Sequence, residues 1–234
     1  MVGLLLFFYE MMSRTSDNPL ILPGLMRISK HLIHLPLLDV LLAVSTTIIR
    51  TLSSYIISII VALMFAVIAN IKEFDKVIKP IIGFFRTIPT ISVMIIILIW
   101  FKQQQAMFII GFLIVLPILF EVFYHSIKNV DPQLKEVSKV YRFSKVKQIK
   151  YIYYYSIIEN FFMSLKQSFG LAFKVMVMSE VIGQARHGIG AEINASRINI
   201  EMEGVIIWTV ILIVIVLLLE RMLKQVSKLI IKWK

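Results

Sequence analysis

Charged side chains within long apolar stretches are the residues of this sequence best placed to do chemistry. Arg50, Lys174 and Glu180 fall where they could reach the middle or outer half of a helical bundle in a membrane. Ionisable groups at such depths are costly, and they usually face a protein interior or a water-filled cavity. Arg50 and Lys174 would give a cavity a positive lining suited to an anion, while Glu180 could instead neutralise one of them. These three residues are therefore the candidates for a polar path through the bundle.

The other reactive residues do not gather into a catalytic or metal site. Arg86, Glu121, Glu159 and Lys166 fall near expected helix ends, where snorkelling or interhelical pairing is the favoured interpretation. The chain has no cysteine and only four histidines, and these are too scattered to bind a metal. An intramembrane enzyme would need acids, histidines or a nucleophile converging at one depth, so it is a minor alternative. We expect no catalytic residue, no metal and no cofactor in this chain.

The elements that must position these residues are membrane-spanning helices. Hydrophobic residues make up 59% of the 234 residues and charged residues 17%, whereas a soluble domain carries about 25% charged residues. The apolar runs are too long and too continuous for barrel strands. The sequence predicts an all-α integral membrane helical bundle of about six transmembrane helices, forming a single domain over residues 1–234. Their expected positions are Val2–Met12, Thr51–Ile71 with an extension back toward Leu37, Ile81–Phe101, Ala106–Tyr124, Ile157–Val181 and Val205–Leu219.

Two features modify this simple pattern. The segment Val2–Met12 is short for a full span, because about 20 residues are needed to cross the hydrocarbon. Pro89 and Pro117 lie inside expected helices and should bend them.

Basic residues predict the orientation of the bundle. Seven of them lie between Lys128 and Lys150, after the fourth apolar segment, and five lie in the tail from Arg221 to Lys234. Positive charges near span ends favour the cytoplasmic side. Both termini and the segment after the fourth helix are therefore expected in the cytoplasm of a multi-pass cell-membrane protein. The same clustering argues against nucleic acid as a partner, because the basic residues act as topology signals between apolar runs.

The basic segment has an internal helical pattern. Asp131 and Pro132 suit the N-cap and first position of a helix. Val137, Val140 and Tyr141 then follow at helical spacing, with the lysines largely between them. Two short amphipathic helices joined at residues 142–144 would present an apolar ridge with a basic surround. Such a pair could lie on anionic lipid headgroups or be held by a cytosolic partner.

The stretch VDPQLKEVSKVYRFSKVKQIKYIYYYSI resembles the cytoplasmic "EAA" loop of bacterial ABC-transporter permeases. Glu136 stands at the glutamate of that pattern, and Val137 and Ser138 replace its two alanines. Arg142 stands where the pattern has glycine, and Tyr155 where it has proline. Three further stretches resemble parts of permeases for nitrate, sulfonates and taurine. FFRTIPTISVMIIILIWF, before the loop, resembles the Arg-x-Ile-Pro start of their third helix. SFGLAFKVMVMSEVIG and the stretch from His187 to Lys224, after the loop, resemble in order their fifth helix, outer loop and last helix.

The resemblance implies a function and a set of partners. Residues 128–155 would be a coupling loop, with a coupling helix between the fourth and fifth spans that sits in a groove of a cytosolic ABC ATPase dimer. Glu136, Val137, Val140, Tyr141 and Arg142 would make that contact. The chain has no Gly-x-x-x-x-Gly-Lys-Ser/Thr stretch, so ATP and Mg²⁺ would be bound by the partner and not by this chain.

The resemblance further implies an importer built from two permease copies, either a homodimer or a pair of related chains. An extracellular or periplasmic solute-binding protein would deliver the solute to loops near Pro36 and residues 188–199. The solute would be a small anion, such as a sulfonate, nitrate or taurine, or a vitamin precursor. An ion-driven secondary transporter is the alternative, but it would show inverted hydropathy repeats and broken helices in matching halves, and the sequence shows neither.

Overall fold

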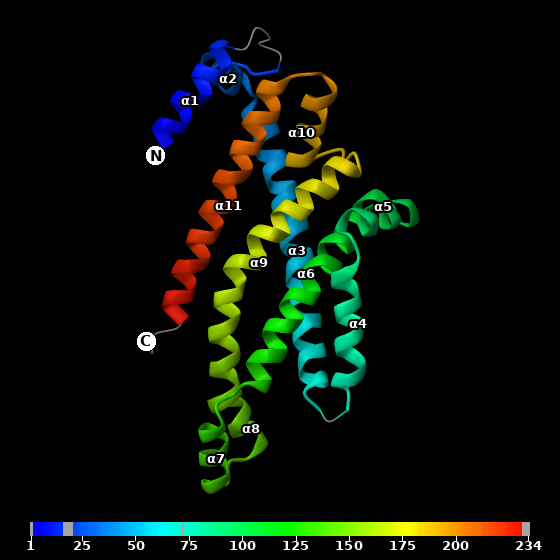
Figure 1. Ribbon diagram of the computed structural model, residues 1–234, viewed down its shortest axis with the longest axis vertical. Helices are drawn as coiled ribbons and strands as arrows, with labels where there is room; N and C mark the ends of the chain where they lie inside the picture. Colours follow the sequence, from blue (N-terminus) through cyan, green and yellow to red (C-terminus); the bar gives the residue numbers. More distant parts are fainter. Residues whose placement is uncertain (1, 16–20, 72, 231–234) are drawn as a thin grey trace.

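The computed structural model describes residues 2–15, 21–71 and 73–230, and over these ranges the regular elements are all helices (Figure 1). The backbone alone is described at residues 2, 3, 5, 6, 156, 159, 163, 166, 167 and 230, so the side chains of Glu159 and Lys166 lie outside this description, as do Lys232 and Lys234. The elements are α1 (Val2–Thr15), α2 (Leu25–His34), α3 (Leu37–Ala69), α4 (Asp75–Thr87), α5 (Thr90–Trp100), α6 (Gln103–Lys128), α7 (Pro132–Val140), α8 (Lys145–Gln148), a π-helical turn (Ile149–Tyr153), α9 (Tyr154–Ile182), α10 (Ile189–Ile198) and α11 (Met202–Ile230).

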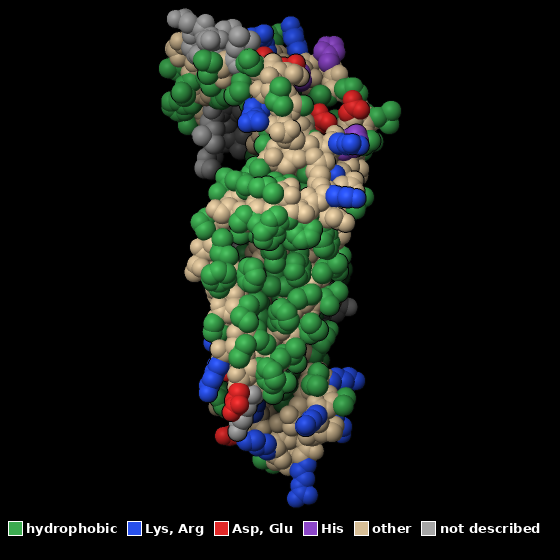
Figure 2. Space-filling view, turned by 90° about the vertical axis from the view of Figure 1, so that its right-hand side faces the viewer, with side chains coloured by type: hydrophobic (Ala, Val, Ile, Leu, Met, Phe, Trp, Pro, Cys, Tyr) green, Lys and Arg blue, Asp and Glu red, His purple; other side chains and the backbone are tan. Residues whose placement is uncertain are grey.

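Three of the described helices are long and apolar enough to cross a membrane: α3, α6 and the Met202–Leu229 part of α11. The pair α4 and α5 makes a fourth span if it is counted as one broken helix. α9 has 29 residues but carries four charged residues, and α1 has only 14 residues. Figure 2 shows apolar side chains over the middle of the molecule and charged side chains gathered toward its two ends. The expected all-α membrane bundle is confirmed, but the first and fifth expected segments do not combine the length and composition of a span.

The expected single helix over Ile81–Phe101 is wrong. The chain forms α4 and α5 there, bent by 94° at the break between them. Ile88 has ψ of 129° and leaves the helical region, because the ring of Pro89 disfavours a helical conformation in the residue before it. Pro89 therefore breaks the helix, which is a stronger effect than the bend expected from the sequence, whereas Pro117 lies inside the continuous α6.

The short helices lie at the two ends of the bundle (Figure 1). α2 and α10 lie at the end where α3 and α11 begin, and α7 and α8 lie at the opposite end, between α6 and α9. The link from α3 to α4 lies toward the same end as α7. The basic segment with α7 and α8 therefore lies at one end of the bundle, and α10, which connects α9 to α11, lies at the other.

α3 is the central helix, and it buries a face of small residues. Apart from Tyr55, every buried residue of α3 is Ala, Ser or Thr: Ala43, Thr47, Thr51, Ser54, Ser58, Ala62, Ala66 and Ala69. Small residues let helix backbones approach closely in a membrane. α6 packs against this face, with Gly111 opposite Ser54, and Ser58 Oγ donates a hydrogen bond of 3.2 Å to the C=O of Phe112.

Replacing Gly111 with alanine should lower the thermal stability of the protein. A Cβ at this position would lie 2.7 Å from Oγ and 3.1 Å from Cβ of Ser54, so α3 and α6 would have to separate, and such overpacking costs about 1–3 kcal/mol. Gly83 on α4 is the matched control, because an added Cβ there meets nothing within 4 Å. Gly83→Ala should be neutral or stabilising, since alanine favours a helix. Equal Tm shifts for the two variants in one detergent would contradict the close approach.

Candidate functional site

The segment between α6 and α9 begins with a helix whose start is fixed by its first residues. Asp131 Oδ1 accepts a hydrogen bond of 2.8 Å from the backbone N–H of Gln133. Pro132 takes the first helical position, where the N–H that it lacks would have no partner within the helix. The helix start predicted at these two residues is confirmed.

α7 ends in a Schellman turn that is made without glycine. Arg142 has φ of 49°, in the left-handed region. The N–H of Phe143 donates to the C=O of Ser138 at 2.8 Å, and the N–H of Arg142 donates to the C=O of Lys139 at 3.0 Å, which is the hydrogen-bond pattern of this motif. Placing a non-glycine residue there costs about 1–2 kcal/mol. The reversal between α7 and α8 is therefore present although arginine replaces the glycine of the EAA pattern.

The outer surface of this segment is an apolar ridge. Val137 and Val140 of α7 and Tyr141 at its C-cap are 46%, 78% and 72% exposed. Val146 of α8 and Ile149 of the π-helical turn are 74% and 62% exposed. We call these five residues the α7–α8 ridge. A contiguous exposed apolar patch marks a surface that binds another protein or a membrane.

Charged and aromatic side chains flank the α7–α8 ridge. Glu136 is exposed, and it takes part in none of the ion pairs found among the described residues. Lys135 Nζ donates a hydrogen bond of 3.4 Å to the C=O of Lys128, which connects α7 to the end of α6. The ring of Phe143 lies 6.4 Å from those of both Tyr141 and Tyr151. The ridge is thus held against the ends of the two long helices that flank it.

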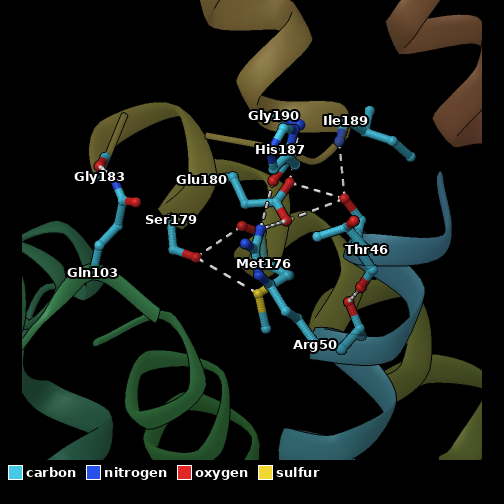
Figure 3. A network of polar contacts seen from close by, with 12 residues as sticks. Thr46, Arg50, Gln103, Met176, Ser179, Glu180, Gly183, His187, Ile189 and Gly190 are labelled. Carbon is cyan, nitrogen blue, oxygen red and sulfur yellow. Dashed lines mark hydrogen bonds and ion pairs between the residues drawn. The ribbon is translucent and has the colours of Figure 1, made fainter. Parts of the chain in front are cut away.

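A second site lies toward the other end of the bundle. It is polar and is centred on the buried carboxylate of Glu180 (Figure 3). Arg50 Nη1 donates a hydrogen bond of 2.9 Å to Oε1 of Glu180, and Thr47 Oγ1 donates one of 2.9 Å to Oε2. The backbone N–H of Gly190 donates to the same Oε2 at 2.9 Å. One guanidinium and the start of α10 therefore compensate the buried negative charge.

The connection from α9 to α10 wraps closely around this carboxylate. Gly188 has φ of 134°, and a Cβ at this position would lie 2.5 Å from Oε1 of Glu180, so both its conformation and its surroundings require glycine. The N–H of Ile189 donates to Thr47 Oγ1 at 2.9 Å, and Arg50 Nη1 also donates to the C=O of His187 at 2.7 Å. These contacts fix the start of α10 to both α3 and α9.

The structure does not bring the three predicted path residues together. Arg50 and Glu180 pair with each other, which is the neutralisation considered from the sequence, and the Arg50 side chain is only 17% exposed. Lys174 is exposed on α9 and belongs to none of the ion pairs formed by the described side chains. Sequence reasoning missed Thr47 and the backbone of residues 188–190, for which the Gly-Ile-Gly stretch was the available signal.

Comparisons with known proteins decide the family. A family model described as "Binding-protein-dependent transport system inner membrane component" matches residues 58–232. The chain belongs to this family. It is therefore a multi-pass inner-membrane permease component of a transport system, as the resemblance implied. The match includes the whole segment with the α7–α8 ridge and the whole Glu180 site except its contacts from α3 residues 47 and 50.

Individual relatives agree with this assignment. The permease is 25% identical over 176 residues to a protein described as an aliphatic sulfonates transport permease, SsuC of Bacillus subtilis (strain 168), covering 74% of this chain and 63% of that protein. A crystal structure of an amino acid ABC transporter with histidines superposes with a TM-score of 0.69 at 19% identity, covering 80% of this chain and 91% of the other. At this identity the second match establishes the shared fold.

Replacing Thr47 with valine should loosen the connection between α9 and α10. The variant removes one donor to Glu180 and leaves the N–H of Ile189 without its acceptor, and each buried group left unpaired costs about 1–3 kcal/mol. Thr47→Ser keeps the hydroxyl and is the matched control. We expect a lower Tm and faster trypsin cleavage after the exposed Arg186 for Thr47→Val alone. The same cleavage rate in both variants would contradict the role of the hydroxyl.

Proposed function

We propose that this permease is the membrane-spanning subunit of an ABC importer and is driven by a separate cytosolic ATPase that binds the α7–α8 ridge. The observation that carries the proposal is the exposure of this ridge between α6 and α9, at one end of the bundle. A partner that moves α7 would act directly on both long helices. Nucleotide-driven closure of an ATPase dimer would then become a rigid-body movement of the membrane helices.

Each residue of the coupling contact has a distinct role in this proposal. Val137, Val140 and Tyr141 fill an apolar groove on the ATPase, and exposed aromatic and aliphatic anchors of this kind dominate binding energy once they are buried. Glu136 pairs with a basic side chain on the partner, because it is exposed on the same helix. Arg142 sets the turn that presents α7 and α8 together. ATP and Mg²⁺ are bound by the ATPase.

The orientation follows from the charges. The lysine-rich α7–α8 end faces the cytoplasm under the positive-inside rule, and the C-terminal end of α11 points toward that side (Figure 1). α1 is too short to span and lies next to α2 toward the other end, so the cytoplasmic N-terminus expected from six spans does not follow from this fold. α2 and α10 then face outward. The loops near Pro36 and residues 188–199 receive a solute-binding protein there, and the hydrogen bonds around Glu180 give that receiving surface a fixed shape.

A second permease copy, identical or related, completes the transporter, since each ATPase of a dimer needs one coupling segment. The name of the Bacillus subtilis relative favours an aliphatic sulfonate as the solute among the small anions and vitamin precursors considered. Lys174 is a candidate for the path because it is an exposed cation on α9. Arg50 and Glu180 are candidates for the structural support of the path, because each satisfies the other's charge.

Replacing Val140 with aspartate should abolish co-purification of the ATPase from the native host in mild detergent. The change places a charge in the centre of the apolar ridge, where burial without a partner is costly, and we expect at least a tenfold loss, or about 1.4 kcal/mol or more. Glu136→Ala should weaken recovery less. Ile33→Asp is the matched control, because Ile33 on α2 is also 78% exposed but lies at the opposite end.

Either of two results would refute this assignment of the ridge. Recovery of the ATPase with Val140→Asp at the wild-type level would mean that the ATPase binds elsewhere. Absence of any ATPase with the folded wild-type chain would favour the alternative in which α7 and α8 lie on anionic lipid headgroups.

A further inference from the structure

Two hollows, each lined in part by α6 and α9, follow one another along these helices, and we call them together the groove. The upper one, in the orientation of Figure 1, lies at the α4–α5 break and has a volume of about 300 Å³. Its wall is mostly aliphatic, with Ile114 and Ile118 from α6 and Leu171 and Val175 from α9. Arg86 is the charged residue in the lining of this hollow.

The lower hollow is larger, at about 610 Å³, and six of its seven lining residues are polar or charged. Glu121 and His125 line it from α6, Asn129 from the C-cap of α6, and Asn160 and Ser164 from α9. On both helices these residues continue, at helical spacing, the faces that line the upper hollow. The groove therefore changes from apolar to polar in the direction of α7.

An ion pair marks the boundary between the two hollows. Arg86 Nη1 of α4 donates to Glu121 Oε1 of α6, which is the interhelical pairing expected for both residues, and their side chains are 51% and 42% exposed. Glu121 lies within the apolar span of α6, where a half-exposed ion pair facing lipid would be costly. The open side of the groove must therefore face water or protein. A pair this exposed adds little stability, so it can exchange partners readily.

The chemistry of the boundary selects a class of solute. A guanidinium binds a sulfonate or carboxylate head through paired hydrogen bonds, and the adjoining aliphatic wall can hold a short alkyl tail. The upper hollow has the size of a small ligand site. An inorganic anion gains nothing from the aliphatic wall, and a neutral solute could accept hydrogen bonds from Arg86 but would lack the stronger charge-assisted pairing.

We propose that Arg86 and Glu121 form an anion-exchange gate in this groove. A small organic anion displaces Glu121 from Arg86 and places its tail in the upper hollow. Return of Glu121 to Arg86 releases the anion into the lower, polar hollow. Arg50 is a weaker candidate, because Glu180 and the C=O of His187 already occupy its Nη1. The gate rests on the proposed transport function and names the group that selects its solute.

Thiol labelling can test the gate, because the chain has no cysteine of its own. The test uses four single Val→Cys variants of the full chain in nanodiscs. Two variants probe the hollows: Val93 lies in the upper hollow and Val122 in the lower one. Two variants are controls: Val146 lies on the α7–α8 ridge and Val214 on the exposed face of α11. The probes are the anionic ethylsulfonate and the cationic ethyltrimethylammonium methanethiosulfonates. We expect the anionic reagent to label Val93→Cys about tenfold faster than the cationic one, because Arg86 raises the local anion concentration.

Neutralising the pair provides the decisive comparison. The combined Arg86→Gln and Glu121→Gln changes should abolish the anion preference at residue 93 without altering labelling at residue 146. Arg86→Lys should retain part of the preference, because it keeps the charge but not the paired hydrogen bonds. Butanesulfonate should slow labelling at residue 93 more than sulfate does. Residue 214 should remain unlabelled if its face lies in lipid.

The gate would be overturned if the anion preference persisted in the neutral variant, or if residues 93 and 122 stayed unlabelled while residue 146 reacted. Equal protection by butanesulfonate and sulfate would overturn the role of the aliphatic wall. The labelling uses no ATPase, so its failure is distinguishable from failure of the transport proposal, which the co-purification experiment measures.

Discussion

The close approach of neighbouring helices to α3 is the constraint on which the rest of the structure depends. In a membrane, burial of apolar side chains does not drive helix association, because lipid tails are equally apolar. Contact area and hydrogen bonds must hold the bundle together instead. The small residues of α3 allow both: Ser58 donates a hydrogen bond to a backbone C=O of α6, and Thr47 accepts one from the backbone N–H at the start of α10. Tyr55 is the large residue of this face, and its hydroxyl lies 2.6 Å from Ser168 Oγ of α9. A bulky residue in this face would disturb three neighbours at once.

The Arg50–Glu180 and Arg86–Glu121 ion pairs show opposite designs. Around Glu180 of α9, side-chain donors from α3 and a backbone donor from α10 satisfy one carboxylate that is closed off from solvent. Such a fully satisfied site is rigid, because moving any one element leaves a charge unpaired. The Arg86–Glu121 pair is half exposed and joins two helices beside hollows. The bundle therefore combines a closed, fully paired site with a half-exposed contact, and in the transport cycle that we propose the first stays fixed while the second opens.

Local signals in the sequence predicted much of the fold. The features that the sequence did not predict depend mostly on contacts between residues far apart along the chain. Apolar length identified α3, α6 and α11, and Asp131 and Pro132 marked the start of α7. The Glu180 site escaped prediction because Thr47 lies 133 residues away along the chain and because the backbone N–H of Gly190, another donor, was signalled only indirectly by the Gly-Ile-Gly stretch. The break at Pro89 was underestimated because proline only bends many membrane helices. Here Ile88 leaves the helical region entirely.

The break between α4 and α5 also gives the molecule two different hydrophobic lengths. α3 continues for 33 residues, or about 50 Å at the usual rise per residue, whereas α4 and α5 have 13 and 11 residues and turn through 94°. Lipids beside α5 therefore meet a much shorter apolar wall, rich in exposed residues such as Ile99 and Trp100. A bilayer adapts to such a mismatch by local thinning or thickening. A change of acyl-chain length would therefore act differently on the broken helix and on the continuous one.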